Sequence, residues 1–399
     1  MSSTGSAPIV PKRAGVTRMD QVQAPIIPVV GAWIRETPGT ISLGQGVVHY
    51  GPPPEALDAV RDALTRPSTH EYNDGAGIAP LVAAIRNKLA EENHIDVSRG
   101  SRIMVTAGAN MAFMHAVLAI TSPGDEIVLP VPFYFNHEMA IEMAGCRAVR
   151  VATDDRYQLR LDLLERAVTD RTRAIVTISP NNPSGAVLSE ASLRAVNDLC
   201  RARGLYHIAD EPYEYFTFGA SRHVSPGSFS EASSRTISMY SLSKAYGFAG
   251  WRIGYMVFPE ALASAMIKSQ DTILICPTIA SQVGAVAALQ VGRGYCQPHV
   301  RELAAIRDIV VSQLSALAPL ASVPTADGAF YILLRVNTTL DPMIIGERLV
   351  REHKVAVIPG TAFGMTDGCY FRVAYGALQK ATVAEGIGRL VEGLRAVLA

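Results

Sequence analysis

Cysteine is scarce in this sequence and follows no pattern. Five cysteines are present, an odd number, and no two of them form a C-x-x-C spacing. Scattered thiols of this kind are typical of proteins kept in a reducing compartment, so we expect no disulfide, no zinc site and a cytoplasmic location. The cysteines are Cys146, Cys200, Cys276, Cys296 and Cys369.

The sequence also lacks an excess of either charge and lacks any long apolar run. Lysine plus arginine and aspartate plus glutamate number 36 each, so no basic field favours nucleic acid or an anionic membrane surface. No uninterrupted apolar segment reaches the roughly 18 residues that a membrane span needs. The partners that we expect are therefore small molecules, with no nucleic acid and no membrane.

Acidic residues are missing from the first part of the chain. Residues 1–19 are rich in Ser, Thr, Gly and Pro and carry Lys12, Arg13 and Arg18. This composition resembles an organelle transit peptide only weakly, and a flexible lead over residues 1–24 is the interpretation that we favour. The whole chain of 399 residues is 49% hydrophobic, which is enough for a large core and two domains.

Short apolar runs recur along the chain, each followed by a break and usually by a helix. Such strands, alternating with helices, are typical of a mostly parallel sheet buried on both faces. After about residue 290 the pattern indicates a smaller α+β unit. We predict an α/β fold in which a segment over residues 25–50 packs with a small domain (291–399), beside a large domain (51–290). The predicted strands of the large sheet are residues 103–108, 126–129, 174–179, 205–209, 236–240 and 253–258.

Unusual residues follow these strands. Gly108 and Ala109 come after the first strand, Asn182 after a second, Asp210 closes a third, and Lys244 follows a fourth. The carboxyl ends of parallel strands share one edge of a sheet, where ligands bind. We therefore expect these residues to lie together, which random polar residues would not do.

Lys244 is the residue around which we expect the site to be organised. It lies in Ser241-Leu242-Ser243-Lys244, a setting too apolar for an ordinary solvated cation. Desolvation and a neighbouring cation such as Arg252 both lower a lysine pKa, and the neutral amine can form a Schiff base with an aldehyde. Taken alone, a lysine whose stem packs along apolar surface is an equally good interpretation.

A pyridine aldehyde phosphate would match the residues gathered here. A phosphate binds backbone N–H groups at a helix N-terminus, hydroxyls and a guanidinium, and a protonated ring nitrogen needs a carboxylate, for which Asp210 is the candidate. Tyr213 and the amide of Asn182 could reach the phenolic oxygen, and Tyr134 could stack on the ring. The phosphate candidates are Gly108, Ala109, Asn110, Ser241, Ser243 and Arg252.

Several motifs in this order resemble the class I/II pyridoxal-phosphate aminotransferases of fold type I, from about residue 25 onward. They are Asn182-Pro183-Ser184-Gly185, Asp210-x-x-Tyr213, Ser241-x-Ser243-Lys244 and Gly250-x-Arg252-x-Gly254. Segments around Gln45, Val105 and Tyr134 are similar to the plant-type aromatic and methionine aminotransferases. Ser184 departs from the threonine common at that position, without removing a charge.

The resemblance implies further roles. Arg372 matches the arginine that binds the substrate α-carboxylate, with the backbone of Gly46 helping, and Asn182 is expected to contact the substrate as well as the cofactor. Lys244 would carry the cofactor, pyridoxal 5'-phosphate, and move the Cα proton. Tyr72 matches a tyrosine that reaches the phosphate of a neighbouring subunit, which implies a homodimer with shared sites. The activity implied is transfer of an amino group from an amino acid to a 2-oxo acid.

The substrate is inferred from the residues around Gly46. Val47, Val48, His49 and Tyr50 follow it, and residues 273–275 (Ile-Leu-Ile) lie in a segment that relatives contribute to the site. An apolar or aromatic pocket favours methionine, phenylalanine, tyrosine or tryptophan as donor over aspartate. An aspartate-type aminotransferase, a β-lyase and a decarboxylase remain alternatives on the same scaffold.

Other interpretations fit less well. Alone, Asp210 could be a helix cap, Asn182 a turn former and Arg372 a surface ion-pair residue. The glycine-rich segments lack the sixth glycine of a dinucleotide fingerprint, and the short lead leaves no room for a DNA-binding module. His49, His115 and His207 have no partners at ligand spacing along the chain, so we expect no metal site.

Overall fold

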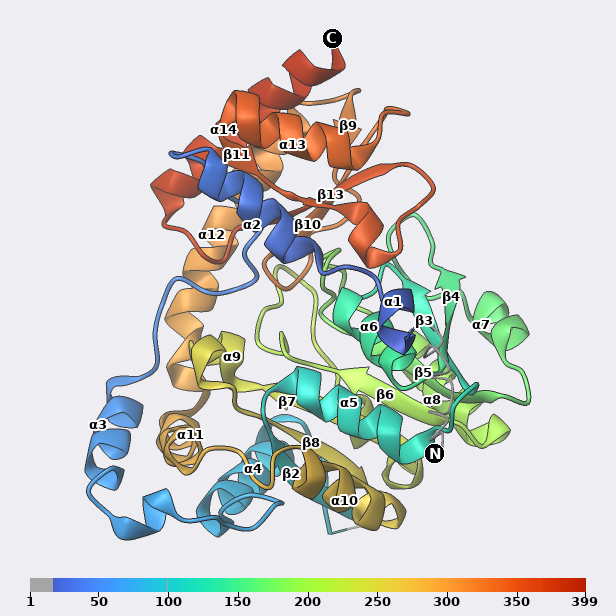
Figure 1. The fold of residues 1–399 in the computed structure, drawn as a ribbon, viewed down its shortest axis with the longest axis vertical. Coiled ribbons are helices and arrows are strands. Elements are labelled where there is room, and N and C mark those ends of the chain that lie inside the picture. Colours follow the sequence, from blue (N-terminus) through green and yellow to red (C-terminus); the bar gives the residue numbers. More distant parts are fainter. Residues whose placement is uncertain (1–16, 99) are drawn as a thin grey trace, which may run out of the picture.

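The computed structural model describes residues 17–98 and 100–399. A large seven-stranded sheet lies at its centre, in the order β2-β8-β7-β6-β5-β3-β4, and a smaller unit lies above it in Figure 1. The strands of the large sheet are β2 (Ser101–Thr106), β3 (Glu126–Val131), β4 (Arg147–Ala152), β5 (Thr172–Ile178), β6 (Tyr206–Asp210), β7 (Thr236–Ser241) and β8 (Gly254–Pro259).

The sheet is mostly parallel, as predicted. Strands β4, β3, β5, β6 and β7 pair in parallel, whereas β8 is antiparallel to both β7 and β2. Only residues 242–253 join β7 to β8, and they contain no crossover helix that could return the chain to the opposite edge. Strand β8 therefore starts at the edge where β7 ends, which brings Arg252 to that edge.

Helices cover both faces of this sheet, as buried parallel strands require. Their apolar faces bury the strands completely, for example Val128, Ile175 and Ile208 at 0% exposure. The helices of this part are α3 (Pro54–Ala63), α4 (Ala79–Glu92), α5 (Ala109–Ile120), α6 (Phe135–Met143), α7 (Leu161–Ala167), α8 (Glu190–Arg203), α9 (Leu242–Ala245), α10 (Ala263–Ile273) and α11 (Ile279–Val291).

The smaller unit is an antiparallel sheet with helices around it. Its four strands lie in the order β12-β13-β10-β9, and β1 pairs separately with β11. The strands are β1 (Ile41–Ser42), β9 (Ala321–Ser322), β10 (Tyr331–Val336), β11 (Val355–Ala356), β12 (Ile358–Pro359) and β13 (Cys369–Ala374). The helices are α2 (Ile26–Glu36), α12 (Cys296–Ser315), α13 (Pro342–His353) and α14 (Lys380–Leu398).

The N-terminal segment packs with this smaller unit, because α2 contacts α13 and β1 pairs with β11. Helix α12 runs from the large sheet up to the smaller unit (Figure 1). Of the predicted lead, residues 1–16 lie outside the described residues, and the rest contains helix α1 (Arg18–Gln21), where Arg18 donates a hydrogen bond to the Met143 carbonyl at 3.1 Å.

Short 3-10 helices complete the fold. They are η1 (Pro67–His70), η2 (Pro226–Ser228), η3 (Ala232–Ser234), η4 (Ala249–Trp251), η5 (Glu260–Leu262), η6 (Gly292–Gly294) and η7 (Gly360–Phe363). No helix in the described ranges is long and apolar enough to cross a bilayer.

Candidate active site

The strand-end residues of the large sheet meet around one cavity. Asp210, the last residue of β6, pairs with Ile178 at the end of β5, and Asn182 follows just beyond β5. Ser241 ends β7 opposite Gly254 of β8. The cavity at this edge has a volume of about 440 Å³. The shared edge that the sequence predicted is therefore present in the structure.

Most of the residues predicted for the site line this cavity. Gly108 lies directly beside it at the start of α5, whereas Tyr72 lies on the surface with 81% of its area exposed and does not line the cavity of its own chain. The predicted residues that line it are Gly46, Ala109, Asn110, Tyr134, Asn182, Asp210, Tyr213, Ser241, Ser243, Lys244, Arg252 and Arg372.

Lys244 reaches into the cavity from the short helix α9. Its ammonium donates a hydrogen bond to the carbonyl of Gly46. Burial, followed by the positive charges of Arg372 and Arg252, lowers the pKa of Lys244 from 10.5 to about 8. Neutral amine is therefore accessible near physiological pH, as a lysine that attacks a carbonyl requires.

Asp210 is buried at the end of β6, with 4% of its area exposed. His137 lies with Nε2 at 3.2 Å from Oδ2 of Asp210, and the imidazole ring stacks on Phe113 at 4.0 Å. The other carboxylate oxygen, Oδ1, is buried without a hydrogen-bond partner among the described residues. A buried carboxylate oxygen in this state is available to a protonated nitrogen of a ligand.

Gly108 and Arg252 form the opposite end of the cavity. Gly108 caps α5 with φ of 78°, in the region that favours glycine. A Cβ atom at this position would lie 2.5 Å from Nη2 of Arg252, so only glycine lets the guanidinium approach the helix start. Ser241 and Ser243 lie on the neighbouring strand end, where Ser241 Oγ accepts a hydrogen bond from the Ser243 N–H at 3.1 Å. Helix N-terminus, guanidinium and hydroxyls together fit a phosphate.

Arg372 enters the cavity from β13 of the smaller unit. It is 2% exposed and donates hydrogen bonds to Asn182 Oδ1 at 2.9 Å and to the Gly44 carbonyl at 2.7 Å. Its Nε has no partner among the described residues. The expected backbone helper at Gly46 instead accepts from Lys244, and Gly44 is the carbonyl that orients the guanidinium.

Among the residues of the site that sequence reasoning missed are His137 and Tyr331. Tyr331 lines the cavity, its hydroxyl lies 2.7 Å from the hydroxyl of Tyr213, and its ring lies 4.8 Å from the guanidinium of Arg372. Burial and the proximity of Tyr331 raise the pKa of Tyr213, so Tyr213 stays a hydroxyl that can donate. Neither residue could be found from spacing, because only the fold brings them to Asp210 and Tyr213.

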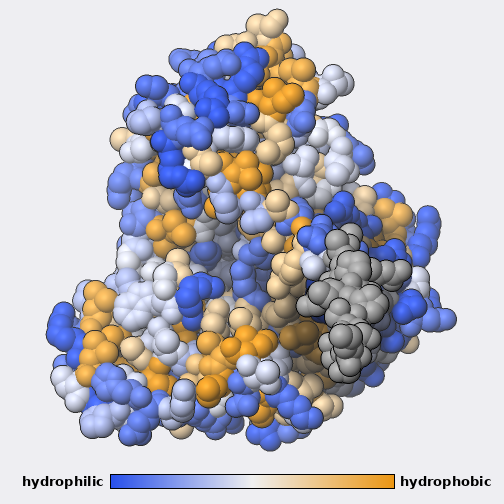
Figure 2. All heavy atoms as spheres, in the orientation of Figure 1, coloured by the Kyte–Doolittle hydropathy of each residue, from blue (hydrophilic) through white to orange (hydrophobic). Residues whose placement is uncertain are grey.

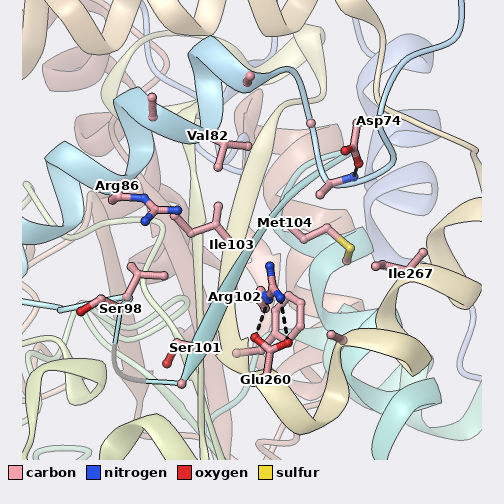
Figure 3. Close-up of a pocket in the computed structure, with 18 of the residues that line it drawn as sticks. Asp74, Val82, Arg86, Ser98, Ser101, Arg102, Ile103, Met104, Glu260 and Ile267 are labelled. Atoms are coloured by element: carbon pink, nitrogen blue, oxygen red, sulfur yellow. Dashed lines mark hydrogen bonds and ion pairs between the residues drawn. The ribbon is translucent and has the colours of Figure 1, made fainter.

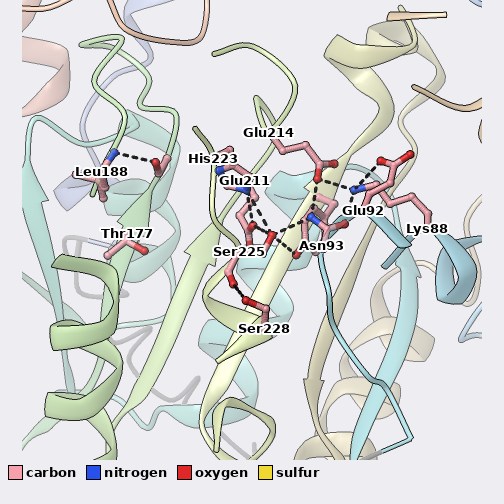
Figure 4. A network of polar contacts seen from close by, with 12 residues as sticks. Lys88, Glu92, Asn93, Thr177, Leu188, Glu211, Glu214, His223, Ser225 and Ser228 are labelled. Carbon is pink, nitrogen blue, oxygen red and sulfur yellow. Dashed lines mark hydrogen bonds and ion pairs between the residues drawn. The ribbon is translucent and has the colours of Figure 1, made fainter. Parts of the chain in front are cut away.

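A buried polar network holds the segment that carries Asp210 and Tyr213 (Figure 4). Lys88 of α4 donates to Asn93 Oδ1 at 2.6 Å and pairs with Glu214. Asn93 donates to Ser225 Oγ at 2.8 Å, and Ser225 donates to Glu211. Because the buried charges are paired and hydrogen-bonded, this network fixes the backbone that follows β6.

The walls of the cavity differ from the expectation for the substrate pocket. Val47 lines the cavity, but Val48, His49 and Tyr50 do not. The predicted contributors at residues 273–275 lie at the end of α10, exposed, and line no part of the cavity in the single chain. Strand β1 ends at Ser42, and the chain then leaves the sheet and enters the site with Gln45, Gly46 and Val47.

A larger cavity, about 890 Å³, lies between α4, β2 and α10 (Figure 3). It is lined by apolar side chains such as Val82, Ile103 and Ile267, and Arg102 pairs there with Glu260 at 2.9 Å. None of the predicted cofactor or substrate residues lines this hollow. It is therefore a surface feature separate from the candidate active site.

The residues of the 440 Å³ cavity fit pyridoxal phosphate. The unpaired Oδ1 of Asp210 suits the protonated ring nitrogen, and the space kept open by Gly108 beside Arg252 suits the phosphate. Lys244 lies between these two ends with a lowered pKa. The fold and the cavity thus define a pyridoxal-phosphate-dependent enzyme of fold type I.

The chain belongs to the class I and II aminotransferases, because the family model described as aminotransferase class I and II matches residues 38–390. An aromatic aminotransferase of Arabidopsis thaliana is 33% identical, covering 94% of both chains. A probable aspartate/prephenate aminotransferase of Aquifex aeolicus is 35% identical, covering 90% of this chain and 91% of its own. A solved structure titled Pyrococcus protein-A1 has a TM-score of 0.90 at 31% identity, covering 96% of this chain and 98% of its own.

Proposed function

We propose that this aminotransferase moves the amino group of a neutral or aromatic L-amino acid, such as methionine, phenylalanine, tyrosine or tryptophan, to a 2-oxo acid. The observation that supports it is the set of basic side chains lining the cavity, which among the described residues is Lys244, Arg252 and Arg372. Each has a role already, at the cofactor carbon, the phosphate and the α-carboxylate. Among the described residues of the single chain, no lining cation remains for the second carboxylate of an aspartate donor.

The remaining walls suit an apolar side chain. Ile27 reaches the cavity from α2, Val47 from the segment after β1, and Tyr134 and Phe135 from the start of α6. Burying an apolar side chain of the size of phenylalanine or methionine contributes roughly 1.5–3 kcal/mol. This supports discrimination by apolar contact rather than by a second ion pair.

The roles that we propose for the protein groups are based on their positions in the cavity. When bound, the cofactor offers an aldehyde carbon to Lys244 and a ring that withdraws electrons from the substrate Cα. Arg372 binds the α-carboxylate and so orients the Cα–H bond toward the Lys244 amine, which takes and returns the proton. Asp210, held by His137, keeps a proton at the ring nitrogen, and Tyr213 donates to the phenolic oxygen.

A donor screen tests the substrate. We expect kcat/KM for phenylalanine, tyrosine, tryptophan or methionine to exceed that for aspartate by about tenfold or more, because a site without a partner for a charged group discriminates strongly against it. Lys244→Ala serves as the inactive control. A preference for aspartate of more than about tenfold would contradict the proposal and favour an aspartate-type enzyme, the activity named for the Aquifex relative. Formation of 2-oxo acid without an acceptor would instead identify a lyase.

We also propose that the enzyme works as a homodimer in the cytoplasm, with Tyr72 reaching the neighbouring site. Tyr72 is 81% exposed, and α10 exposes Ile267 at 49% and its last residue, Ile273, at 46%. The carbonyl of Ile275 lies beside Gly75, so this end of α10 and the Tyr72 segment form one surface. Figure 2 shows apolar side chains gathered in patches over the lower part of the visible face. A second copy of the chain is the occupant that we propose for this surface.

A further inference from the structure

Two histidines and a glutamate lie together at the base of helix α12, outside the candidate active site. His299 and Glu302 are three residues apart on α12 and so share one face of the helix. His49, from the segment that leaves β1, lies against them, and its Nε2 is 3.4 Å from Oε2 of Glu302. One ligand atom from each of these three side chains lies within 4.8 Å of the other two.

No possible metal ligand lies at a suitable spacing from His49 in the sequence, but the fold brings His299 and Glu302 beside it. His49 lies in the loop after β1. This loop passes helix α12, which begins at Cys296, about 250 residues later in the sequence. His49 is only 10% exposed in its side chain, and its Nδ1 is buried without a partner in the described structure. A nine-tenths buried imidazole with an unsatisfied nitrogen is therefore held beside the other two groups.

The chemistry of the cluster suits a late first-row divalent metal. Two imidazoles and one carboxylate are a donor set that zinc uses with water in a fourth position. Ligand atoms about 2.0–2.2 Å from a tetrahedral zinc lie about 3.4 Å apart, which matches the distance of 3.4 Å between His49 and Glu302. Tyr50 stacks on His299 at 3.7 Å and 9° and so limits the orientation of that ring.

We propose that His49, His299 and Glu302 form a binding site for a divalent transition metal, with zinc favoured. The site goes beyond the proposed aminotransferase reaction and does not depend on which amino acid is the donor. The proposed metal site lies next to the candidate active site, since Tyr50 donates a hydrogen bond to the carbonyl of Lys244 at 3.0 Å. A bound ion would join the segment between Gly46 and Tyr50 to helix α12.

Zinc chloride titrated into the purified holoenzyme tests the site directly, with bound metal measured by equilibrium dialysis. We expect one zinc per chain in the wild type and a loss of affinity of at least about tenfold in His299→Gln and Glu302→Gln. Asp308→Asn removes a carboxylate from the same helix outside the cluster and should bind zinc as the wild type does.

Cobalt(II) gives a second readout, because d–d absorption bands report coordination by protein groups. These bands should form in the wild type and in Asp308→Asn and be absent in His299→Gln. Failure of the wild type to bind zinc at millimolar concentration would overturn the proposal. Equal zinc affinity in the wild type and Glu302→Gln would overturn it too, because Glu302 would then not be a ligand.

Discussion

Two buried polar atoms of the cavity have no hydrogen-bond partner in the described structure and are therefore available to a ligand. Oδ1 of Asp210 and Nε of Arg372 are both buried and unpaired in the described structure. An unsatisfied buried polar atom costs about 1–3 kcal/mol, and the surrounding contacts from His137 and Asn182 hold both groups in place despite that cost. Under the proposed function, the cofactor would supply the partner for Asp210 and the substrate the partner for Arg372, so both residues are in position before either ligand binds.

The lowered pKa of Lys244 predicts how cofactor attachment depends on pH. The reactive form is the neutral amine, whose fraction rises as pH increases through the pKa, so attachment of pyridoxal phosphate to the cofactor-free protein should accelerate with a midpoint near 8. An ordinary lysine would still be protonated there, since its pKa is about 10.4. Stopped-flow absorbance of the cofactor measures the rate.

Two variants control this measurement. Lys244→Arg keeps the charge but cannot form the covalent link, so it should show no such phase. Arg372→Met removes a cation that lowers the pKa of Lys244, so the midpoint should move to higher pH. A wild-type midpoint above about 10, the range of an ordinary lysine, would contradict the prediction.

At the scale of elements, the sequence predicted the buried strands because each is a continuous apolar run. Strand β4 was missed because it lies at the edge of the sheet, where Arg147 and Arg150 interrupt the apolar residues and only Val151 is buried. The antiparallel direction of β8 could not be predicted from the sequence either, because an apolar run has the same pattern in a parallel and in an antiparallel strand. The strand-end residues were predictable from this order, whereas the place of Arg372 in the site was implied only by the family resemblance.

The turn between β2 and α5 carries a prediction at this scale. Gly108→Ala should weaken cofactor binding, since a Cβ atom would lie 2.5 Å from Nη2 of Arg252 and displace the guanidinium from the phosphate position. Losing a charged hydrogen bond costs about 1.5–3 kcal/mol, which corresponds to roughly ten- to hundredfold weaker binding. Cofactor dissociation constants by absorbance titration give the comparison.

Gly204→Ala is the matched control. Gly204 has φ of 69° but nothing within 4 Å of a Cβ atom, and it caps α8 away from the cavity. Both variants should unfold more easily, by about 1–3 kcal/mol for such backbone strain, but only Gly108→Ala should lose cofactor affinity. Equal cofactor affinity in the two variants would show that the space beside Arg252 has no role in phosphate binding.

At the scale of the whole molecule, both the large sheet and the smaller unit contribute residues to the cavity. Asp210 and Lys244 come from the large sheet, whereas Arg372 comes from β13 of the smaller unit and bonds Asn182 across 190 positions of sequence. The segment after β1 adds Gly44 and Gly46 from a third part of the chain. The end of the cavity at Asp210 and Lys244 is therefore fixed by one sheet, and the end at Arg372 depends on how the two units meet.

The proposed homodimer gives a prediction that extends beyond one chain. Tyr72→Phe should leave the dimer intact and weaken cofactor binding about ten- to hundredfold, because it removes one charge-assisted hydrogen bond to the neighbour's phosphate.

Ile267→Asp places a charge on the exposed surface near the Tyr72 segment and should shift the protein toward monomers, with loss of cofactor. Leu340→Asp makes the same exchange at a side chain that is equally exposed, 48% against 49%, on the smaller unit, and should remain dimeric. Sedimentation velocity gives the oligomeric state and absorbance titration the affinity. A monomeric wild type, or a Tyr72→Phe variant with unchanged cofactor affinity, would contradict a shared site, because a tyrosine that is 81% exposed on its own chain has no other route to a phosphate.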